Sequence, residues 1–361
     1  MYPEEGELLF PPCTTLQNVV VERMETLNKY LVLARPHICT MRHYTDGLLY
    51  PWASPNDPLT HEEYTMVLEA EREKLDSSES APGKLGGHVS DLITGEPKAA
   101  ALGLEEYMKF DLSAALAHSS KLEAIEAEFK LAEDKTLDDG RTLWWWFDYV
   151  KNQPASSSEV RWGARDLGHD GMRLKDFWQT DEATKVRLKE EHVMALRLYT
   201  CTPVSFALNA PLRNFKRDEH NKVLRPVSMC AEHPFPVTFS VLNEAIKRLR
   251  DVEGKVVITL WRGLKNMDVS QDFLLAGGVE MAPMSTTYSL KTALFYSHSS
   301  NSIILKCVTR SFMERGANLS WISVFPGEQE CLFPPVTCLS PTGRTQKVGK
   351  TFTIVEVTPR L

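Results

Sequence analysis

The sequence lacks the features that would connect it with nucleic acid or with a membrane. Its 41 lysines and arginines are outnumbered by 48 aspartates and glutamates, which gives a net charge of -7 and an isoelectric point near 5.9. Nucleic-acid-binding proteins usually carry a basic face, so we expect no nucleic acid partner. No run reaches the ~18 apolar residues of a membrane span. The acidic start, with Glu4, Glu5 and Glu7, does not resemble a secretory signal, and we expect a cytoplasmic protein.

Metal-site and nucleotide-binding motifs are also missing. The seven cysteines are widely spaced and form no CxxC pair, so we interpret them as reduced thiols and expect no metal. Neither HExxH nor an EF-hand loop occurs. The absence of GxGxxG and of the P-loop pattern disfavours a Rossmann dehydrogenase and a nucleoside triphosphatase. No fixed repeat indicates a solenoid or a propeller.

The composition present is that of a soluble globular protein, with 361 residues, 43% hydrophobic and 25% charged. We expect a mainly helical N-terminal region of unknown role over residues 1–155 and a second domain over 156–361. The breaks that suggest this division are the Ser-, Pro- and Gly-rich run at 76–87 and NQPASSS at 152–158. The aromatic cluster at 143–147 could form a carbohydrate or partner platform, but a packed core is favoured.

Helical spacing of apolar residues is followed later in the chain by strands. We predict an amphipathic helix over 121–132, a helix capped by Thr180 or Asp181 that continues to Tyr199, and a helix whose first turn Thr238 caps. Helices first and strands later indicate an α+β domain rather than a βαβ repeat. The β-branched segments predicted as strands are KVVITLW, SIILKCV and TFTIVEV.

Three short segments in the strand-rich part have chemical uses, and the first is Trp261-Arg262-Gly263. An arginine at a strand end can pair with a dinucleotide phosphate, and a following glycine lets a ligand approach the backbone. Many strands end in Arg-Gly for turn geometry alone, so this pair by itself indicates little.

The other two segments are Ser285-Thr286-Thr287 and Glu328-Gln329-Glu330. In an extended strand the hydroxyls of Ser285 and Thr287 would share one face, and Glu328 and Glu330 would project together from one side of theirs. Repulsion between two neighbouring carboxylates raises the pKa of at least one of them. Proteins tolerate such repulsion mostly where the carboxylates have a function. The alternatives are a hydroxyl-rich edge and a solvent-exposed acidic edge.

These segments resemble those of the arginine-specific mono-ADP-ribosyltransferases, whose site is written Arg, Ser-Thr-Ser and Glu-x-Glu. WRGLKN, GGVEMAPMSTT and FPGEQECLFPP occur in that order, and LRLYT and LNAPLRN resemble the family's leading helices. The resemblance spans about Trp162 to Val357 and does not include residues 1 to about 155. It implies an ADP-ribosyltransferase-like split β-sheet, with two facing sheets, helices packed to one side and NAD in the cleft between them.

The resemblance also implies roles for individual residues. NAD would be a co-substrate, and no other cofactor is implied. Arg262 would hold the NAD phosphates or the nicotinamide ribose, while the backbone of Gly263 meets the carboxamide. Ser285 would support the ribose. Thr287 replaces the family's second serine and keeps the hydroxyl. An aromatic ring, Phe295 or Tyr296, would stack on nicotinamide.

The two glutamates would divide the chemistry. Glu330 would bind the ribose 2′-hydroxyl and stabilise the oxocarbenium-like charge that develops as nicotinamide leaves. Glu328 would engage the guanidinium of an arginine-bearing protein acceptor, whose identity the sequence does not give. Two alternatives stay open at this point. One is an NAD glycohydrolase that uses the same site with water as acceptor, and the other is a non-catalytic NAD-binding or interaction module.

Overall fold

The computed structural model of the chain describes residues 14–24, 29–38, 57–76, 87–88, 93–94, 113, 117–134, 137, 140–160, 163–213, 233–250, 257–311 and 314–360. The chain divides into two compact units, Met1–His61 and Glu62–Leu361. In the first unit, β1 (Thr14–Met24) and β2 (Lys29–Ile38) form an antiparallel hairpin that we did not predict. Residues 77–86 of the expected Ser-, Pro- and Gly-rich loop lie outside the described residues.

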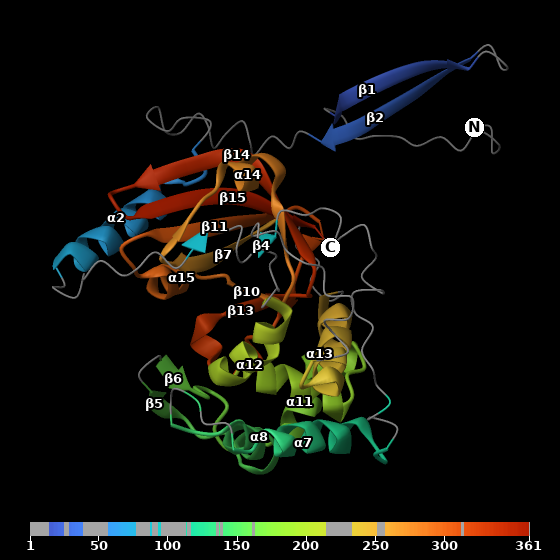
Figure 1. Cartoon of the computed structure of the whole chain (residues 1–361), viewed down its shortest axis with the longest axis vertical. Helices are drawn as coiled ribbons and strands as arrows, with labels where there is room; N and C mark the ends of the chain where they lie inside the picture. The colour runs from blue at the N-terminus through green and yellow to red at the C-terminus, as the bar shows by residue number, and fades with distance from the viewer. Residues whose placement is uncertain are drawn as a thin grey trace, which may run out of the picture. The chain divides into compact units, whose positions relative to one another are not determined.

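The second unit is an α+β fold, as expected, with one large sheet and two groups of helices (Figure 1). No helix among the described residues is long and apolar enough to cross a membrane. The N-terminal region contains the helices α2 (His61–Asp76), α7 (Lys121–Leu131) and α8 (Leu143–Asn152). The later helices are α9 (Leu174–Trp178), α10 (Asp181–Lys185), α11 (Glu190–Tyr199), α12 (Thr202–Arg213), α13 (Pro236–Leu249), α14 (Gln271–Ala276), α15 (Leu290–Ser297) and the 3-10 helix η3 (Pro326–Glu328).

Nine strands follow one another in the large sheet in the order β12-β13-β10-β7-β11-β15-β14-β9-β4. The predicted strands are confirmed as β7, β11 and β15, and β11 and β15 pair in parallel. The sheet strands are β4 (Ile93–Thr94), β7 (Ile258–Lys265), β9 (Gly278–Glu280), β10 (Met284–Thr287), β11 (Ser302–Thr309), β12 (Ala317–Asn318), β13 (Glu330–Phe333), β14 (Thr337–Val348) and β15 (Phe352–Arg360). Two small ladders pair β3 (Gly87–His88) with β8 (Met267–Asp268) and β5 (Ser158–Val160) with β6 (Gly163–Arg165).

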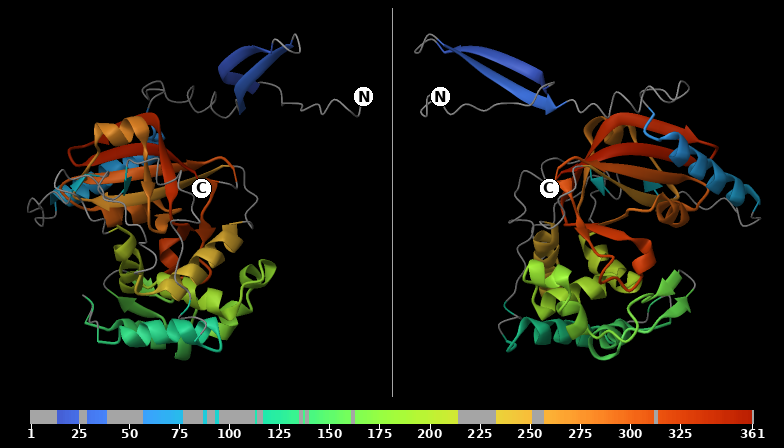
Figure 2. Two further views of the ribbon diagram at one scale, coloured as in Figure 1. Left: turned by 45° about the vertical axis from the view of Figure 1, so that its right-hand side comes forward. Right: turned by 180° about the vertical axis from the view of Figure 1, so that it is seen from behind.

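The split of this sheet takes the form of a narrow joint rather than two separate sheets. Strands β10 and β7 are connected by a single register pair, Thr287 with Trp261. On one side of the joint lies the small part of the sheet (β12, β13 and β10), and on the other lies the large part, from β7 to β4. Helices α7, α8, α11, α12 and α13 gather beside the small part, at the end of the unit away from the large part (Figure 2).

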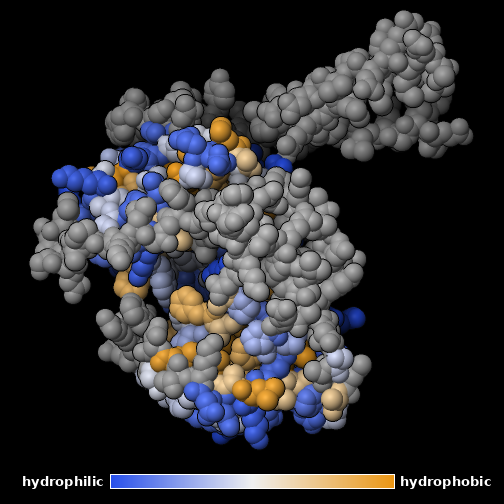
Figure 3. Space-filling model, viewed as in Figure 1, coloured by the Kyte–Doolittle hydropathy of each residue, from blue (hydrophilic) through white to orange (hydrophobic). Residues whose placement is uncertain are grey.

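Two hydrophobic cores meet at β13. One core joins the helices to the small part of the sheet and includes Leu332, while the other fills the large part and includes Cys331 and Phe333. Successive side chains of a strand point to opposite faces, so β13 contributes to both cores. The surface is hollowed between the sheet and the helices, near α15 and β10, and apolar surface gathers around α12 (Figure 3).

The aromatic cluster at 143–147 forms part of α8 and packs as core. Leu143, Trp146 and Phe147 are at most 3% exposed, which confirms the interpretation we favoured over a binding platform. The break at NQPASSS follows α8 directly. Because α7 and α8 share one core with α11 and α13, the helices on both sides of residue 155 pack together. The functional boundary at that position stays a prediction.

Two predicted helices differ from those observed. The helix expected from Thr180 to Tyr199 is divided into α10 and α11, because Arg187 adopts the left-handed conformation with φ 54°. Thr180 does cap α10, through its hydroxyl and the Ala183 amide. Helix α13 begins at Pro236, and Thr238 does not cap it. Instead the carboxylate of Glu128 on α7 accepts hydrogen bonds from the amides of the first turn.

Candidate active site

The three motif segments meet at the joint of the sheet. Thr287, the last residue of β10, pairs with Trp261 on β7 and with Glu330 on β13. Arg262 follows Trp261 directly, and Ser285 pairs with Leu332 on β13. The hydrogen-bonded register thus places strands from three distant parts of the chain beside one another. The sequence predicts this grouping only through the order of the motifs.

Glu330 is a buried carboxyl at the start of β13. Its side chain lies in the interior, with the residue 7% exposed, and burial raises its pKa from 4.5 to about 8. A hydrogen bond from the Ser285 hydroxyl opposes this shift, and the nearby charge of Glu328 adds to it. Glu330 therefore holds its proton well above the usual pH range of a glutamic acid.

Glu328 reaches the same place by a different route from the one we predicted. It ends the 3-10 helix η3 instead of lying on a strand with Glu330, and Gln329 between them is left-handed with φ 50°. Neither Glu328 nor Gln329 is extended, so the period of two does not apply. The two carboxyls nevertheless lie close enough for Glu328 to raise the pKa of Glu330.

Two side chains, those of Thr287 and Tyr296, donate hydrogen bonds to Glu328. The hydroxyl of Thr287 donates to the main-chain oxygen of Glu328 at 2.6 Å, and the hydroxyl of Tyr296 on α15 donates to its Oε1. Burial raises the pKa of Glu328, and the hydrogen bond from Tyr296 opposes that shift. The Tyr296 hydroxyl is therefore committed to Glu328, while Phe295 beside it is 50% exposed. Stacking of either ring on nicotinamide stays a prediction.

Arg262 is buried and paired with a glutamate that the sequence analysis did not single out. Its Nη2 donates to Oε2 of Glu280 at 2.8 Å, and Arg213 from α12 donates to both oxygens of the same carboxylate, at 3.1 and 3.2 Å. Nη1 of Arg262 is buried without a hydrogen-bond partner in the part of the chain that the structure describes. Burial lowers the pKa of Arg262. Glu280 lies within GGVEMAPMSTT, and Arg213 within LNAPLRN.

Gly263 is required by the packing of the fold, whatever else its backbone contacts. A Cβ at this position would lie 2.1 Å from the carbonyl oxygen of Ala293 and 2.9 Å from the amide nitrogen of Ser297. Both residues belong to α15, which packs directly on β7 at this glycine. Alternate residues of β7 face opposite sides, and Gly263 faces α15. Contact of the Gly263 backbone with the nicotinamide carboxamide stays a prediction.

A tyrosine and an asparagine connect the helices to β10, and the sequence analysis did not identify either of them. The hydroxyl of Tyr199 donates to the carbonyl oxygen of Pro283 at 3.2 Å and accepts from Nδ2 of Asn209 at 3.0 Å. Burial and the charge of Glu330 raise the pKa of Tyr199. Tyr199 lies in LRLYT and Asn209 in LNAPLRN, so both motifs reach the site.

Comparison with known proteins gives matches among solved structures alone. No family model and no curated protein sequence matches the chain. HopU1 of Pseudomonas syringae pv. tomato is 18% identical over 59% of this chain and 94% of its own, with a TM-score of 0.39. An ADP-ribosyltransferase from Clostridium botulinum is 15% identical over 51% and 93%, with a TM-score of 0.36, and the eukaryotic mono-ADP-ribosyltransferase ART2.2 is 16% identical over 52% and 78%, with a TM-score of 0.32. Each is an ADP-ribosyltransferase to which part of this chain is similar.

Proposed function

We propose that this protein is a mono-ADP-ribosyltransferase that transfers ADP-ribose from NAD to an arginine side chain and releases nicotinamide. The observation that carries the proposal is the pair of carboxyls at the joint, Glu330 in the interior and Glu328 at the end of η3. Each has its own hydroxyl donor, Ser285 for the first and Tyr296 for the second. Buried neighbouring carboxyls are costly, and proteins keep them mostly where they act on a substrate.

Cleavage of NAD breaks the bond between ribose C1′ and the nicotinamide nitrogen, and the electron pair leaves with nicotinamide. The ribose develops positive charge in the transition state, and a carboxylate fixed beside it stabilises that charge. In this proposal ionised Glu330 has that role and also accepts a hydrogen bond from the 2′-hydroxyl. Ser285, which donates to Glu330, keeps the carboxylate oriented.

Transfer to arginine needs a second group, because a protonated guanidinium is a poor nucleophile. Glu328 would orient the guanidinium and accept its proton while the nitrogen attacks C1′. A raised pKa makes Glu328 a stronger base than an ordinary carboxylate, which suits this step. Glu328 is the reason to propose an arginine acceptor in preference to water.

The NAD phosphates need a cationic partner, and Arg262 meets that need best. Its Nη1 is a buried donor with no hydrogen-bond partner among the described residues, and an anion beside β7 would satisfy it. Arg213 shares Glu280 with Arg262 and is 21% exposed at its side chain. The proposed chemistry draws on these two guanidinium groups and the two carboxyls.

The test measures nicotinamide release from labelled NAD together with labelling of agmatine or polyarginine. We expect Glu330→Gln to abolish both activities and Glu328→Gln to abolish only labelling. Glu182→Gln is the matched control, because Glu182 is an exposed glutamate in the first turn of α10. Release without labelling by the wild type would make the protein an NAD glycohydrolase. No release at all would leave a non-catalytic module.

A further inference from the structure

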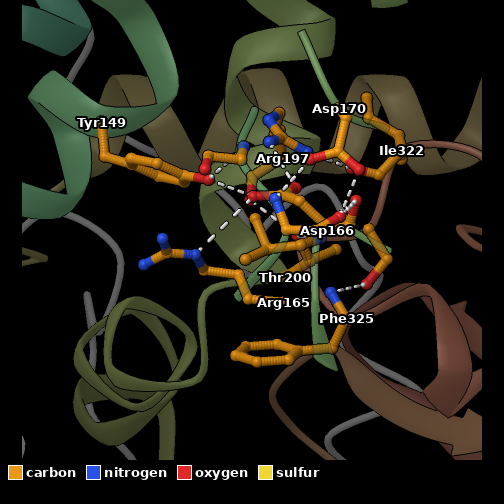
Figure 4. Close-up of polar contacts among 12 residues, drawn as sticks. Tyr149, Arg165, Asp166, Asp170, Arg197, Thr200, Ile322 and Phe325 are labelled. Carbon is orange, nitrogen blue, oxygen red and sulfur yellow. Dashed lines mark hydrogen bonds and ion pairs between the residues drawn. The ribbon is translucent and has the colours of Figure 1, made fainter. Parts of the chain in front are cut away.

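A buried polar cluster lies among the helices and has no part in the chemistry proposed above (Figure 4). Asp166 is fully buried and Arg197 is 2% exposed. Oδ1 of Asp166 accepts from Nη2 of Arg197 at 2.7 Å, and Oδ2 accepts from the hydroxyl of Tyr149. The guanidinium of Arg197 also lies 4.3 Å from the centre of the Phe177 ring. We call Tyr149, Asp166, Arg197 and the adjoining Thr200 the anchor cluster.

The anchor cluster binds the main chain of the segment that leads to the two site glutamates. Nη1 of Arg197 donates to the carbonyl oxygen of Ile322 at 3.1 Å. The amide of Asp166 donates to the carbonyl oxygen of Val324 at 2.7 Å, and the amide of Val324 donates to the hydroxyl of Thr200 at 3.0 Å. The main chain at Ile322 and Val324 is thus held by residues that are distant in the sequence.

The anchor cluster is a poor arrangement if its only role is to stabilise the fold. A buried ion pair usually contributes less than apolar residues of the same volume would, because both charges lose their hydration. Asp166 also adopts the left-handed conformation, with φ 52°, which few residues other than glycine adopt without cost. Its effect is to fix the main chain at 322–324, where buried amides and carbonyls need partners.

The position of this segment matters more to Glu328 than to Glu330. From Val324 the chain passes through Phe325, whose carbonyl oxygen accepts from the Glu328 amide at 3.0 Å. Glu328 therefore lies on a short turn whose base is held by the anchor cluster. Glu330 lies beyond this turn on β13, where its main chain pairs with Thr287 in the sheet. The Thr287 hydroxyl also binds the main-chain oxygen of Glu328, but the anchor cluster binds main chain that lies before β13 in the sequence.

We propose that the anchor cluster is a positioning device for Glu328, so that it controls transfer of ADP-ribose to the acceptor guanidinium independently of NAD cleavage. The inference rests on the function proposed above for Glu328. Asp166 and Arg197 touch neither substrate in this scheme. They act by holding the segment 322–328 at the correct distance from the carboxyl of Glu330.

The best position for a test is Thr200, because Asp166→Asn would leave Arg197 as an uncompensated buried charge. The Thr200 hydroxyl accepts from the Val324 amide and donates to the carbonyl oxygen of Arg197 at 2.7 Å. Thr200→Val removes both hydrogen bonds and keeps the shape of the side chain, while Thr200→Ser keeps the hydroxyl. Thr309→Val is the matched control. Thr309 is a fully buried threonine of β11 whose hydroxyl also donates to a carbonyl oxygen, that of Ile258 at 3.0 Å.

We expect Thr200→Val to lower acceptor labelling by about fivefold or more, which is the factor for loss of the hydrogen bond to the Val324 amide alone, while nicotinamide release without acceptor changes less than about twofold. Thr200→Ser should restore labelling, and Thr309→Val should leave the ratio of labelling to release unchanged. Equal loss of both activities in Thr200→Val, or no loss of either, would overturn the proposal.

Hydrogen exchange gives a second result that does not depend on turnover. The amides of residues 322–329 should exchange faster in Thr200→Val than in the wild type and in Thr309→Val. Unchanged exchange over this segment would also overturn the proposal. If the wild type releases no nicotinamide but residues 322–329 still exchange faster in Thr200→Val, the proposed function is refuted. The role of the anchor cluster in holding the segment 322–328 then stands.

Discussion

At the scale of single residues, burial determines the chemistry of Glu330. Its pKa of about 8 arises mainly because the interior disfavours the carboxylate, whereas the proposed reaction needs that carboxylate to stabilise a cation. A dinucleotide that brings positive charge to the nicotinamide ribose would favour ionisation. The free protein, however, is mostly protonated at this position near neutral pH.

The pH dependence of NAD cleavage follows from this shift. Because kcat/KM reports the ionisation of the free enzyme, we expect kcat/KM for NAD to fall by about tenfold per pH unit below 8 and to level off above 8. Rates of nicotinamide release from pH 5.5 to 9.5 measure this profile. A flat profile across neutral pH would contradict the assignment of Glu330.

Unfolding checks the same titration without turnover. The native protein keeps the proton on Glu330 between pH 4.5 and about 8, while the unfolded chain has lost it. The stability associated with the protonated form is complete below pH 4.5 and is lost as pH rises to 8. Glu330→Gln should therefore raise the free energy of unfolding relative to the wild type at pH 8, by on the order of 3 to 5 kcal/mol, and much less at pH 4.5.

Tyr296 tunes the second carboxyl. Its hydrogen bond favours the charged form of Glu328 and opposes the effect of burial, so Tyr296→Phe should raise the pKa of Glu328 further. We expect acceptor labelling by this variant to reach half its maximum at a higher pH than in the wild type, with nicotinamide release unshifted. Parallel pH series of the two activities measure this. A shift of both profiles together would show that Tyr296 acts on Glu330 instead.

At the scale of elements, the contact of α15 with β7 determines where Arg262 and Tyr296 lie. Gly263 is where the helix and the strand approach each other, and Arg262 projects from the opposite face of the same strand. The packing of α15 also determines where Tyr296 points. A change at Gly263 would therefore disturb both sides of the joint.

Gly263→Ala should be strongly destabilising. The added methyl group would lie 2.1 Å from the oxygen of Ala293, and relief requires a shift of backbone, so we expect a loss of at least about 1–3 kcal/mol. Urea unfolding measures the loss. Gly327→Ala is the control, since no atom outside Gly327 and its two chain neighbours lies within 4 Å of its Cβ position. Equal stability of the two variants would contradict the packing described for α15.

The start of α13 depends on a residue from another helix. The carboxylate of Glu128 on α7 accepts from the amides of Val237 and Thr238 at 2.6 and 3.0 Å and also from the Thr238 hydroxyl. Glu128→Ala should cost about 2 kcal/mol of unfolding free energy, because two helix-end amides lose their acceptor. Glu126→Ala on the same helix removes only a partly exposed pair with Lys151 and should cost less than about 1 kcal/mol. Thermal unfolding of both variants tests the difference.

At the scale of the whole molecule, the site lies where two cores meet. The core of the helices includes Leu332, the core of the large part of the sheet includes Cys331 and Phe333, and Glu330 precedes them on the same strand. The joint between β10 and β7 has a single register pair, so polar side chains can lie there without interrupting either core. A functional site at this seam leaves the packing of both cores intact.

Truncation can distinguish two boundaries, the one between the compact units after His61 and the one that we predicted near residue 155. A chain that begins at Asp57 keeps all the site residues and both cores, so we expect it to release nicotinamide at the rate of the full chain. A chain that begins at residue 156 loses α7 and α8 from the core of the helices and should be insoluble or unfolded. Solubility and circular dichroism of both chains measure the outcome. A folded, active chain from residue 156 would show that α7 and α8 are dispensable.

The sequence by itself determined the local features of this protein. Apolar periodicity was sufficient for α7, because burial of one helix face is encoded at fixed spacing. The preference of aromatic side chains for burial was sufficient for the core role of residues 143–147, and β-branched composition was sufficient for the strands β7, β11 and β15. The α+β class followed from the order of those elements. The motif order indicated that Arg262, Ser285 and Glu330 belong to one site, and the register pairs of Thr287 place their strands side by side.

Only the tertiary structure decided how distant residues act on one another. The cap of α13 comes from Glu128, the partner of Arg262 is Glu280, the room at Gly263 is taken by α15, and Glu328 is placed by a turn that Asp166 and Arg197 hold. None of these follows from local spacing, because hydrogen bonds and steric contacts depend on distance in space. Burial likewise sets the pKa of Glu330, and burial exists only once the chain has folded.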